Sequence, residues 1–291
     1  MSRIAYVNGR YLPHAVAAVH VEDRGFQFAD AVYEVCEIRD GKIVDPTLHF
    51  ERLERSLREL RIAVPMSRAA TLVVMRRVAR LNRVHDGSIY IQVSRGQAHR
   101  DHVFPSPDVP PTVVMTAKPV ARAKGEALAE KGIGVITVPD NRWERVDIKS
   151  VSLLPNCLAK QAAKEAGARE AWFVDADGYV TEGGSTNAWI VTAEGVLVTR
   201  PAEHGILRGI TRTITLKVAA DLGLRVEERG FSVDEAKRAR EAFVTAATTL
   251  VMPVVAIDEA SVGNGAPGST ALTLRHAFHD ATERVAIRAT P

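Results

Sequence analysis

Several features that define other classes of protein are scarce in this sequence. It has two cysteines, Cys36 and Cys157, too few for a disulfide framework and without zinc-site spacing. Aromatic residues make up only 5% of the chain and seldom accompany the scattered arginines, so no nucleic-acid surface is expected. No apolar run approaches the length of about 18 residues that spans a membrane, and the N-terminus lacks the apolar core of a signal peptide. The sequence therefore predicts a soluble, cytoplasmic protein.

What the chain does have is enough apolar sequence for a large core. Of its 291 residues, 46% are hydrophobic and 25% are charged, which suits one large domain or two of ordinary size. The formal net charge of +3 is mildly basic and compatible with small anionic ligands.

The first third of the chain reads as hairpins followed by helices. Asn8-Gly9 is a type I′ turn signal between two short strands, and a second hairpin is centred on Asp40-Gly41. Ser67 is expected to cap a helix. The expected helices are 47–60 and 68 to about 83, and the expected strands are 88–96 and 112–119. The proline-rich stretch 97–111 is predicted to be a long loop, and long loops in compact domains are often functional.

Beyond about Arg122 the pattern changes to strands alternating with single helices. Helices are expected over 154–166 and 211–222, from Ser232 and from Ser269, and strands within 134–140, 145–154, 170–183, 187–200, 225–229 and 242–258. The predicted organisation is an N-terminal α/β domain over 1–118, a linker over 119–125 and a larger C-terminal domain over 126–291.

Lys149 lies in the stretch RVDIKSVSLL, which alternates and then turns apolar. If this stretch is a strand, Asp147 and Lys149 share one face while Ile148 and Ser150 share the other. One interpretation is an ion pair of the two charged side chains on a solvated edge. The other is a lysine facing a pocket, where burial favours the neutral amine and allows it to form a Schiff base with an aldehyde.

Glu182 lies in the stretch YVTEGGSTNAW, where a strand runs into glycines and hydrogen-bonding side chains. An ordinary hairpin loop explains the Gly, Ser, Thr and Asn residues. It does not explain a carboxylate at the strand end, which can pair with a buried cation such as a pyridinium nitrogen.

Gly209 precedes the helix that is expected to open at Ile210 and Thr211. Free backbone N–H groups at such a start favour a phosphate, and the threonine hydroxyl adds a donor. The alternative is that the threonine only caps the helix.

The long loop brings Arg95, His99, Arg100 and His102 close together in sequence. An arginine and a histidine two residues apart can clamp a carboxylate, the arginine through two parallel hydrogen bonds. The alternatives are a solvated loop or a weak metal site, and no metal is expected because no carboxylates with ligand spacing accompany the histidines.

Together these motifs supply an amine, a partner for a pyridinium, a phosphate site and a carboxylate clamp, which are the parts of a pyridoxal phosphate aminotransferase. Their order and spacing resemble fold type IV pyridoxal phosphate enzymes, and among them the D-amino acid aminotransferases, over nearly the whole chain. The matching stretches are DRGFQFADAVYEV, HFERL, SRGQAHRDHVFP, DIKSVSLLPNCLAKQAA, TEGGSTN, ILRGITR and FVTAATTLVMPV. The resemblance implies pyridoxal 5′-phosphate and an α/β (α+β) subunit with a smaller N-terminal α/β domain and a larger C-terminal pseudo-barrel domain.

The resemblance also implies roles for individual residues. Lys149 is expected to form the Schiff base and to move the proton, and Glu182 to contact the pyridine nitrogen. The remaining cofactor contacts implied by the resemblance are Arg52, Leu207, Ile210, Thr211, Ser185 and Thr248.

On the substrate side, the resemblance assigns Tyr33, Arg100 and His102 to the substrate carboxylate, the last two delivered from a neighbouring subunit. It implies a homodimer with composite sites that exchanges the amino group between D-alanine, D-glutamate or D-aspartate and 2-oxo acids by a ping-pong mechanism. Branched-chain L-amino acid aminotransferases and (R)-selective amine transaminases are the alternatives within the fold.

Two positions depart from the family pattern. Ala247 replaces a hydroxyl residue expected at the cofactor phosphate, where Thr248 is a possible substitute, and Gly184 replaces a common serine. Losing one hydroxyl donor weakens cofactor binding by up to about tenfold. The altered Ala246-Ala247 stretch is the only feature that favours a second hypothesis, a catalytically silent binding protein.

Overall fold

The computed structural model describes residues 3–203 and 205–287, and contacts within the chain divide it into two units. Unit 1 comprises the residues up to Arg122, the short segment Ile148–Ser152 and the residues from Glu283 onward. Unit 2 comprises Ala123–Asp147 and Leu153–Thr282. The chain therefore leaves unit 1 twice, after Arg122 and after Ser152, and returns to it twice, at Ile148 and at Glu283.

The predicted contiguous C-terminal domain differs from this division at two places. The chain first passes from unit 1 to unit 2 after Arg122, within the predicted linker 119–125. Segment 148–152 and strand β16 (Arg284–Ala286), both predicted in the second domain, belong to unit 1 because their backbones bond to its sheet. Composition reveals a linker, but it does not reveal which sheet a distant segment joins.

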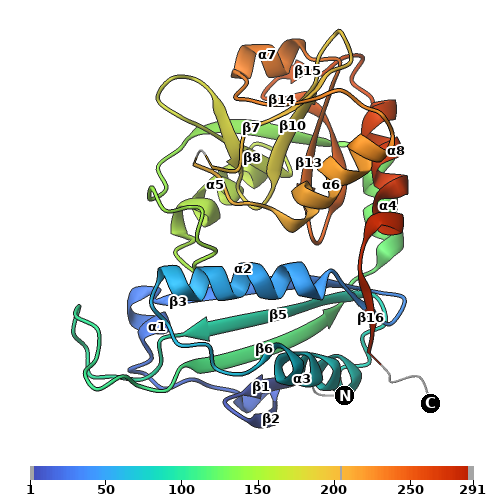
Figure 1. Ribbon diagram of the computed structural model, residues 1–291. Helices are drawn as coiled ribbons and strands as arrows, with labels where there is room; N and C mark the ends of the chain where they lie inside the picture. The colour runs from blue at the N-terminus through green and yellow to red at the C-terminus, as the bar shows by residue number, and fades with distance from the viewer. Residues whose placement is uncertain (1–2, 204, 288–291) are drawn as a thin grey trace. The chain divides into compact units, whose positions relative to one another are not determined.

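Unit 1 is built on a seven-stranded antiparallel sheet in the order β16-β4-β3-β5-β6-β1-β2. Its remaining strands are β1 (Ile4–Val7), β2 (Arg10–Pro13), β3 (Ala31–Arg39), β4 (Lys42–Val44), β5 (Gly87–Ser94) and β6 (Thr112–Pro119). Its helices are η1 (His14–Val16), α1 (Arg24–Phe28), α2 (Pro46–Glu59) and α3 (Arg68–Leu81). Figure 1 shows α2 lying along this sheet.

Local sequence accounts for the turns and caps of unit 1. Asn8 and Gly9, with φ of 44° and 87°, connect β1 to β2, and Asp40 and Gly41 connect β3 to β4 in the same way. Ser67 caps α3 by accepting a hydrogen bond from the backbone N–H of Ala70. The predicted hairpins and this cap are therefore confirmed.

The core of unit 1 lies between one face of the sheet and the apolar sides of α2 and α3. Alternate residues of the central strands point to this face, as period-two alternation requires. The side chains of this core include Val32, Cys36, Phe50, Leu53, Leu57, Met75, Val78, Ile89 and Ile91. This packing fixes the position of α2, which carries Arg52, relative to β3, which carries Tyr33.

Unit 2 is built on a nine-stranded mixed sheet whose main path is β12-β11-β10-β13-β14-β7-β8-β9, with β15 on β14. Its strands are β7 (Ile133–Pro139), β8 (Glu170–Val174), β9 (Val180–Gly183), β10 (Asn187–Val191), β11 (Leu197–Thr199), β12 (Val226–Glu228), β13 (Glu241–Ala246), β14 (Leu250–Ile257) and β15 (Ala260–Ser261). Its helices are α4 (Arg122–Ala129, whose first residue belongs to unit 1), α5 (Leu154–Glu165), α6 (Ile210–Asp221), α7 (Val233–Arg238), α8 (Ser269–Ala277) and η2 (Phe278–Ala281).

The sheet of unit 2 curls, because β9 at one end of the path contacts β10 near the middle. β8 is buried on both faces: Trp172 packs in the main core, and Phe173 packs on the other side against α5. Figure 1 shows α6 and α8 near β13, which both helices contact. The curled sheet agrees with the pseudo-barrel expected for this unit.

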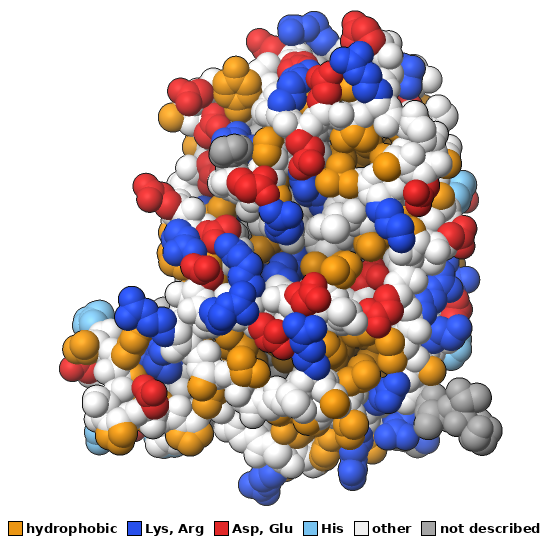
Figure 2. Space-filling model, viewed as in Figure 1, with side chains coloured by type: hydrophobic (Ala, Val, Ile, Leu, Met, Phe, Trp, Pro, Cys, Tyr) orange, Lys and Arg blue, Asp and Glu red, His pale blue; other side chains and the backbone are white. Residues whose placement is uncertain are grey.

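Figure 2 shows basic and acidic side chains interspersed on the visible faces of both units. Among the described residues, no helix combines the length and apolar character needed to cross a bilayer.

Candidate active site

Lys149 lies on a segment that bonds to the start of β3 in unit 1. The backbone N–H of Tyr33 donates to the Lys149 carbonyl at 3.0 Å, and Ser150 forms an isolated bridge with Val32. The expected strand over 145–154 is wrong, because residues 144–147 form turns and only this bridge pairs. Burial still alternates from Ile148 to Ser150, both buried, so the alternating side-chain directions were right for these three residues.

The Lys149 amine faces an aromatic ring. Its Nζ lies 4.3 Å from the centroid of the Tyr33 ring, and its backbone N–H donates to the buried Ser56 hydroxyl at 3.3 Å. Asp147 pairs with Arg145 instead, and among the described residues no carboxylate pairs with Lys149. The solvated ion pair of Asp147 with Lys149 is therefore excluded, and a partly buried amine takes its place.

Tyr33 itself sits in a small aromatic group. Its ring lies 5.7 Å from that of Tyr90, whose hydroxyl donates to Gln92 Oε1 at 2.6 Å. Burial and the neighbouring Tyr33 raise the pKa of Tyr90 to about 12, so its hydroxyl stays neutral at physiological pH. The structure thus brings together two of the predicted residues, Lys149 and Tyr33.

Arg52 forms an ion pair with the buried carboxylate of Glu34, a residue that the sequence analysis did not single out. Its Nε and Nη2 donate to the two oxygens of Glu34 at 2.7 and 2.8 Å, and His49 Nδ1 lies 2.7 Å from the same carboxylate. Burial alone would raise the pKa of Glu34, but Arg52 and His49 hold it well below its ordinary value. Glu34 falls between Val32 and Cys36 in the inward-facing alternation of β3, a signal that could have revealed it.

Arg100 and His102 lie on the exposed loop between β5 and β6, and both contact one aromatic ring. The Arg100 guanidinium carbon is 5.1 Å from the centroid of Phe28, and the His102 ring centroid is 5.3 Å from it. The structure therefore brings this predicted pair together, and Phe28 is a neighbour that the sequence analysis missed.

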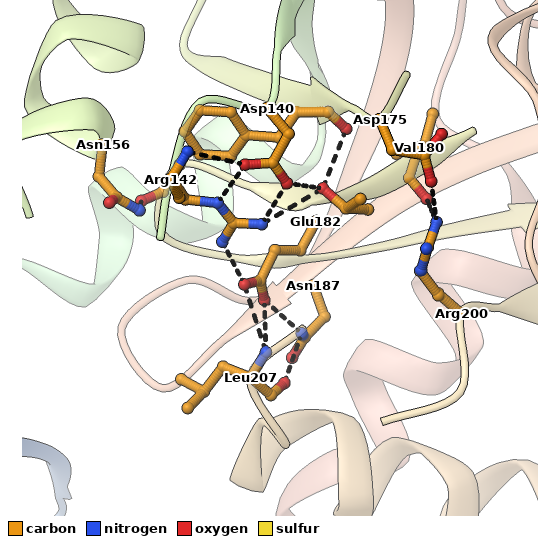
Figure 3. Close-up of polar contacts among 12 residues, drawn as sticks. Asp140, Arg142, Asn156, Asp175, Val180, Glu182, Asn187, Arg200 and Leu207 are labelled. Atoms are coloured by element: carbon orange, nitrogen blue, oxygen red, sulfur yellow. Dashed lines mark hydrogen bonds and ion pairs between the residues drawn. The ribbon is translucent and has the colours of Figure 1, made fainter. Parts of the chain in front are cut away.

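In unit 2, Glu182 ends β9 as a buried carboxylate surrounded by donors (Figure 3). Arg142 Nη1 donates to its Oε1, Asn187 Nδ2 donates to Oε2 at 3.1 Å, and the Leu207 backbone N–H lies 3.2 and 3.1 Å from the two oxygens. The predicted Leu207 thus contacts Glu182 through its backbone.

Arg142 is shared between two carboxylates. Its Nε and Nη2 donate to Asp140 at 2.9 and 2.7 Å, while Nη1 serves Glu182. Burial would raise the pKa of Asp140, but hydrogen bonds from Arg142 and Thr181 lower it overall. Arg142 thus donates to two carboxylates at once, and sequence patterns alone did not distinguish it from the exposed arginines.

The turn after Glu182 is organised by another buried carboxylate, Glu170. The predicted Ser185 donates to Glu170 Oε2 at 3.1 Å, and Lys160 Nζ lies 3.1 Å from Oε1. A β-carbon at Gly184 would lie 3.0 Å from both Glu170 Oε1 and Lys160 Cδ, so this pair accounts for the glycine where a serine was expected. The structure gives Ser185 a protein partner, and its predicted cofactor contact stays a prediction.

The start of α6 has no side-chain cap. Gly209 is the N-cap, and Ile210 and Thr211 are buried in the first turn. A β-carbon at Gly209 would lie 2.0 Å from Asn187 Oδ1, which explains the glycine by close approach. Because no side chain satisfies the helix start, its N–H groups and positive dipole end suit an anion. The capping alternative for Thr211 is thus excluded.

The whole chain resembles known aminotransferases. The family model for Amino-transferase class IV matches residues 31–257. The chain belongs to this family. The D-alanine aminotransferases of Bacillus licheniformis and Staphylococcus haemolyticus are 38% and 37% identical to it, covering 90% and 94% of this chain and 90% and 96% of theirs. A branched-chain amino acid aminotransferase from T.th., solved with pyridoxamine 5′-phosphate, has 28% identity and a TM-score of 0.87, with 96% and 94% coverage.

Membership of the class IV aminotransferases confirms the predicted fold type, the mixed α/β architecture and the enzyme class. The residues of this class IV aminotransferase also fit the cofactor of such enzymes, pyridoxal 5′-phosphate. An amine, a buried carboxylate and a helix start without a side-chain cap are the groups that its aldehyde, pyridine nitrogen and phosphate require.

The hydroxyl groups near Ala247 are less favourably placed to bind a cofactor phosphate. The predicted Thr248 is exposed in the turn between β13 and β14. Its neighbour Thr249 has a buried Oγ1 without a partner among the described residues. Thr249 is thus a second hydroxyl in this turn, and the sequence analysis missed it because the turn geometry decides which threonine is covered.

Proposed function

We propose that this class IV aminotransferase transfers amino groups between D-amino acids, with D-alanine, D-glutamate and D-aspartate as candidates, and 2-oxo acids by a ping-pong mechanism. The observation that carries the proposal is the Lys149 amine, partly buried, without a carboxylate partner, and 4.3 Å from the Tyr33 ring centroid. A lysine amine that no carboxylate holds is available to form a Schiff base with an aldehyde and to act as a base.

Each cofactor role follows from the chemistry of a described residue. Pyridoxal phosphate, when bound, supplies the electron sink for the carbanion left after loss of the α-proton. Lys149 would hold the cofactor through its aldehyde and would act as the base that moves the proton. Glu182 would accept a hydrogen bond from the pyridine nitrogen, and the start of α6, with Ile210 and Thr211, would bind the phosphate. Arg52, Leu207, Ser185 and Thr248 are proposed as further contacts.

The choice of D-amino acids rests on Arg100 and His102. Both side chains contact Phe28, so an arginine fork and an imidazole N–H are held side by side as donors for one α-carboxylate. The relatives at 38% and 37% identity are D-alanine aminotransferases. The alternative, a branched-chain aminotransferase, is favoured by the solved structure with a TM-score of 0.87.

We also propose a homodimer in which each copy supplies Arg100 and His102 to its partner's site. Large apolar side chains of unit 1 are exposed, among them Val16, Val21, Phe26 and Val103, and a second copy would bury such residues. The proposed location is the cytoplasm, where the two free cysteines stay reduced.

The first test replaces the proposed nucleophile. We expect Lys149→Ala to lower turnover at least about a thousandfold, since it removes both the covalent attachment and the base. Wild type should show the near-ultraviolet to violet absorbance of a lysine-bound cofactor, and the variant should lose it. Lys237→Ala, a lysine of α7 that pairs with Asp258, is the control and should keep both. Full turnover in Lys149→Ala would refute the mechanism.

The second measurement decides the substrate. Parallel assays with D-alanine, L-leucine and a simple chiral amine are expected to give the highest kcat/KM for D-alanine. Inactivity with D-alanine together with turnover of L-leucine would establish the branched-chain alternative.

A further inference from the structure

The loop that carries Arg100 and His102 is exposed, yet a buried arginine of α1 holds its backbone. Arg24 is 3% exposed, and its Nη1 donates to the carbonyl of Asp101 at 2.6 Å and to that of Val103 at 3.3 Å. Its Nη2 donates to the carbonyl of His102 at 3.4 Å. One guanidinium therefore binds three consecutive carbonyls directly after Arg100.

Arg24 is itself held by a buried ion cluster. Asp30 Oδ2 accepts from Arg24 Nε at 2.8 Å and from Arg95 Nε at 2.7 Å. Arg95 also donates to the carbonyls of Leu60 and Arg61 at the end of α2. Because every member is paired, the cluster fixes the direction in which Arg24 presents its remaining N–H groups.

Phe28, at the end of the same helix, contacts both side chains of the loop. Its ring centroid is 4.8 Å from the Arg24 guanidinium carbon, 5.1 Å from that of Arg100 and 5.3 Å from the His102 ring. Each such contact is weak alone, but together they hold both recognition side chains at one ring.

We propose that Arg24 is a positioning residue that holds Arg100 and His102 in the geometry that binds the substrate carboxylate, with Phe28 as the ring that both side chains contact. This inference rests on the proposed carboxylate role of the pair. Arg24 touches no substrate. It restricts the conformation of the exposed loop before the substrate binds, so less conformational entropy is lost on binding.

The experiment uses the holoenzyme with D-alanine and a fixed 2-oxo acid. In Arg24→Lys, which keeps the charge but loses the fork, we expect KM for D-alanine to rise about tenfold while kcat changes less than about twofold, because a positioned clamp is worth that much or more. Phe28→Leu should raise KM by about threefold. Arg77→Lys is the control, because Arg77 lies over the Tyr11 ring in the same unit, and it should change neither value.

A double-mutant cycle separates this inference from the proposed function. Arg100→Leu should raise KM by itself, and Arg24→Lys should add nothing in that background, since it acts through the same contact. If Arg100→Leu leaves KM unchanged, the carboxylate role fails whatever Arg24 does. If Arg100→Leu raises KM and Arg24→Lys adds its full effect to it, or has none alone, the positioning role is overturned.

NMR relaxation supplies a readout that does not depend on turnover. In Arg24→Lys the backbone order parameters of residues 101–103 should fall below those of wild type, because their carbonyls lose the guanidinium that holds them, while those of β5 stay unchanged. Should Arg24→Lys fail to fold, Phe28→Leu decides the matter: unchanged KM and unchanged order parameters of the loop would overturn the proposal.

Discussion

Each unit buries a carboxylate against a guanidinium, and the two clusters differ in how many carboxylates that guanidinium serves. In unit 1, Glu34 faces the fork of Arg52 and also His49, two cationic or donor groups for one carboxylate. In unit 2, Arg142 faces both Glu182 and Asp140, so one guanidinium serves two carboxylates. The Glu34 carboxylate thus receives two donor side chains, whereas Glu182 and Asp140 share the guanidinium of Arg142.

This difference in the number of carboxylates that each guanidinium serves indicates which buried ion pair is suited to a ligand. A carboxylate matched by its own cations gains little from another one, so Glu34 mainly fixes α2 to β3. A carboxylate that shares one guanidinium with a second carboxylate favours a further cation, and a protonated pyridine nitrogen is one.

The largest expected effect separates the two carboxylates by activity. Glu182→Gln removes the carboxylate charge that we propose contacts the pyridine nitrogen, and we expect turnover to fall about a hundredfold, as when one preorganised electrostatic contact is lost. Steady-state kinetics of the cofactor-saturated enzyme measure this. Glu241→Gln is the control, because Glu241 is also buried in unit 2 but caps the start of α8. Equal losses in both variants would mean that Glu182 is only structural.

The next effect concerns stability. Glu34→Gln leaves Arg52 and His49 buried without their carboxylate, and we expect the free energy of unfolding to fall by about 3 kcal/mol. Urea unfolding of the variant measures the loss. Glu54→Gln, which breaks the exposed pair of Glu54 with Arg68, should change stability little. A Glu34→Gln variant as stable as wild type would show that the pair contributes nothing net.

The same pair predicts a dependence of stability on pH. The pKa of Glu34 is lower in the folded than in the unfolded protein, so its contribution is fully present above the ordinary value of 4.5. It is lost progressively as the pH falls below that value. The acid slope of the unfolding free energy should therefore be shallower in Glu34→Gln than in wild type, and identical slopes would contradict the assignment.

The smallest expected effect tests whether Asp140 competes with Glu182 for Arg142. In Asp140→Asn the carboxylate of Glu182 no longer shares the Arg142 guanidinium with a second carboxylate. We therefore expect turnover to fall by about threefold, the size of one partly exposed charge interaction. Asp175→Asn is the control, because Asp175 pairs with Arg200 elsewhere in unit 2 and should have no effect. A loss as large as that of Glu182→Gln would mean that Asp140 matters in its own right.

Local elements followed from the sequence because their causes are local. The turn at Asn8-Gly9, the cap at Ser67 and the cap at Ser232, which accepts from the Glu235 N–H, each depend on a few adjacent residues. The prediction of Lys149 as the special amine also depended on a local pattern of alternation. These features needed no knowledge of the remainder of the chain.

The rest depended on contacts between distant residues. Arg24 bonds to carbonyls more than 70 positions away, and Arg142 reaches Glu182 over 40 positions. Segment 148–152 pairs with β3 through its backbone, and backbone pairing carries no residue signature. Sequence patterns therefore identified the reactive groups but not the side chains that hold them.

The return of the chain to unit 1 has a consequence for synthesis. The sheet of unit 1 gains its edge strand β16 only when residues 284–286 have emerged from the ribosome, long after β4, its neighbour, was made. Lys149 likewise joins β3 only after more than a hundred intervening residues have been translated. Unit 1 is thus the first part begun and the last completed, so a nascent chain cannot present its reactive amine in place before the second unit has begun to be made.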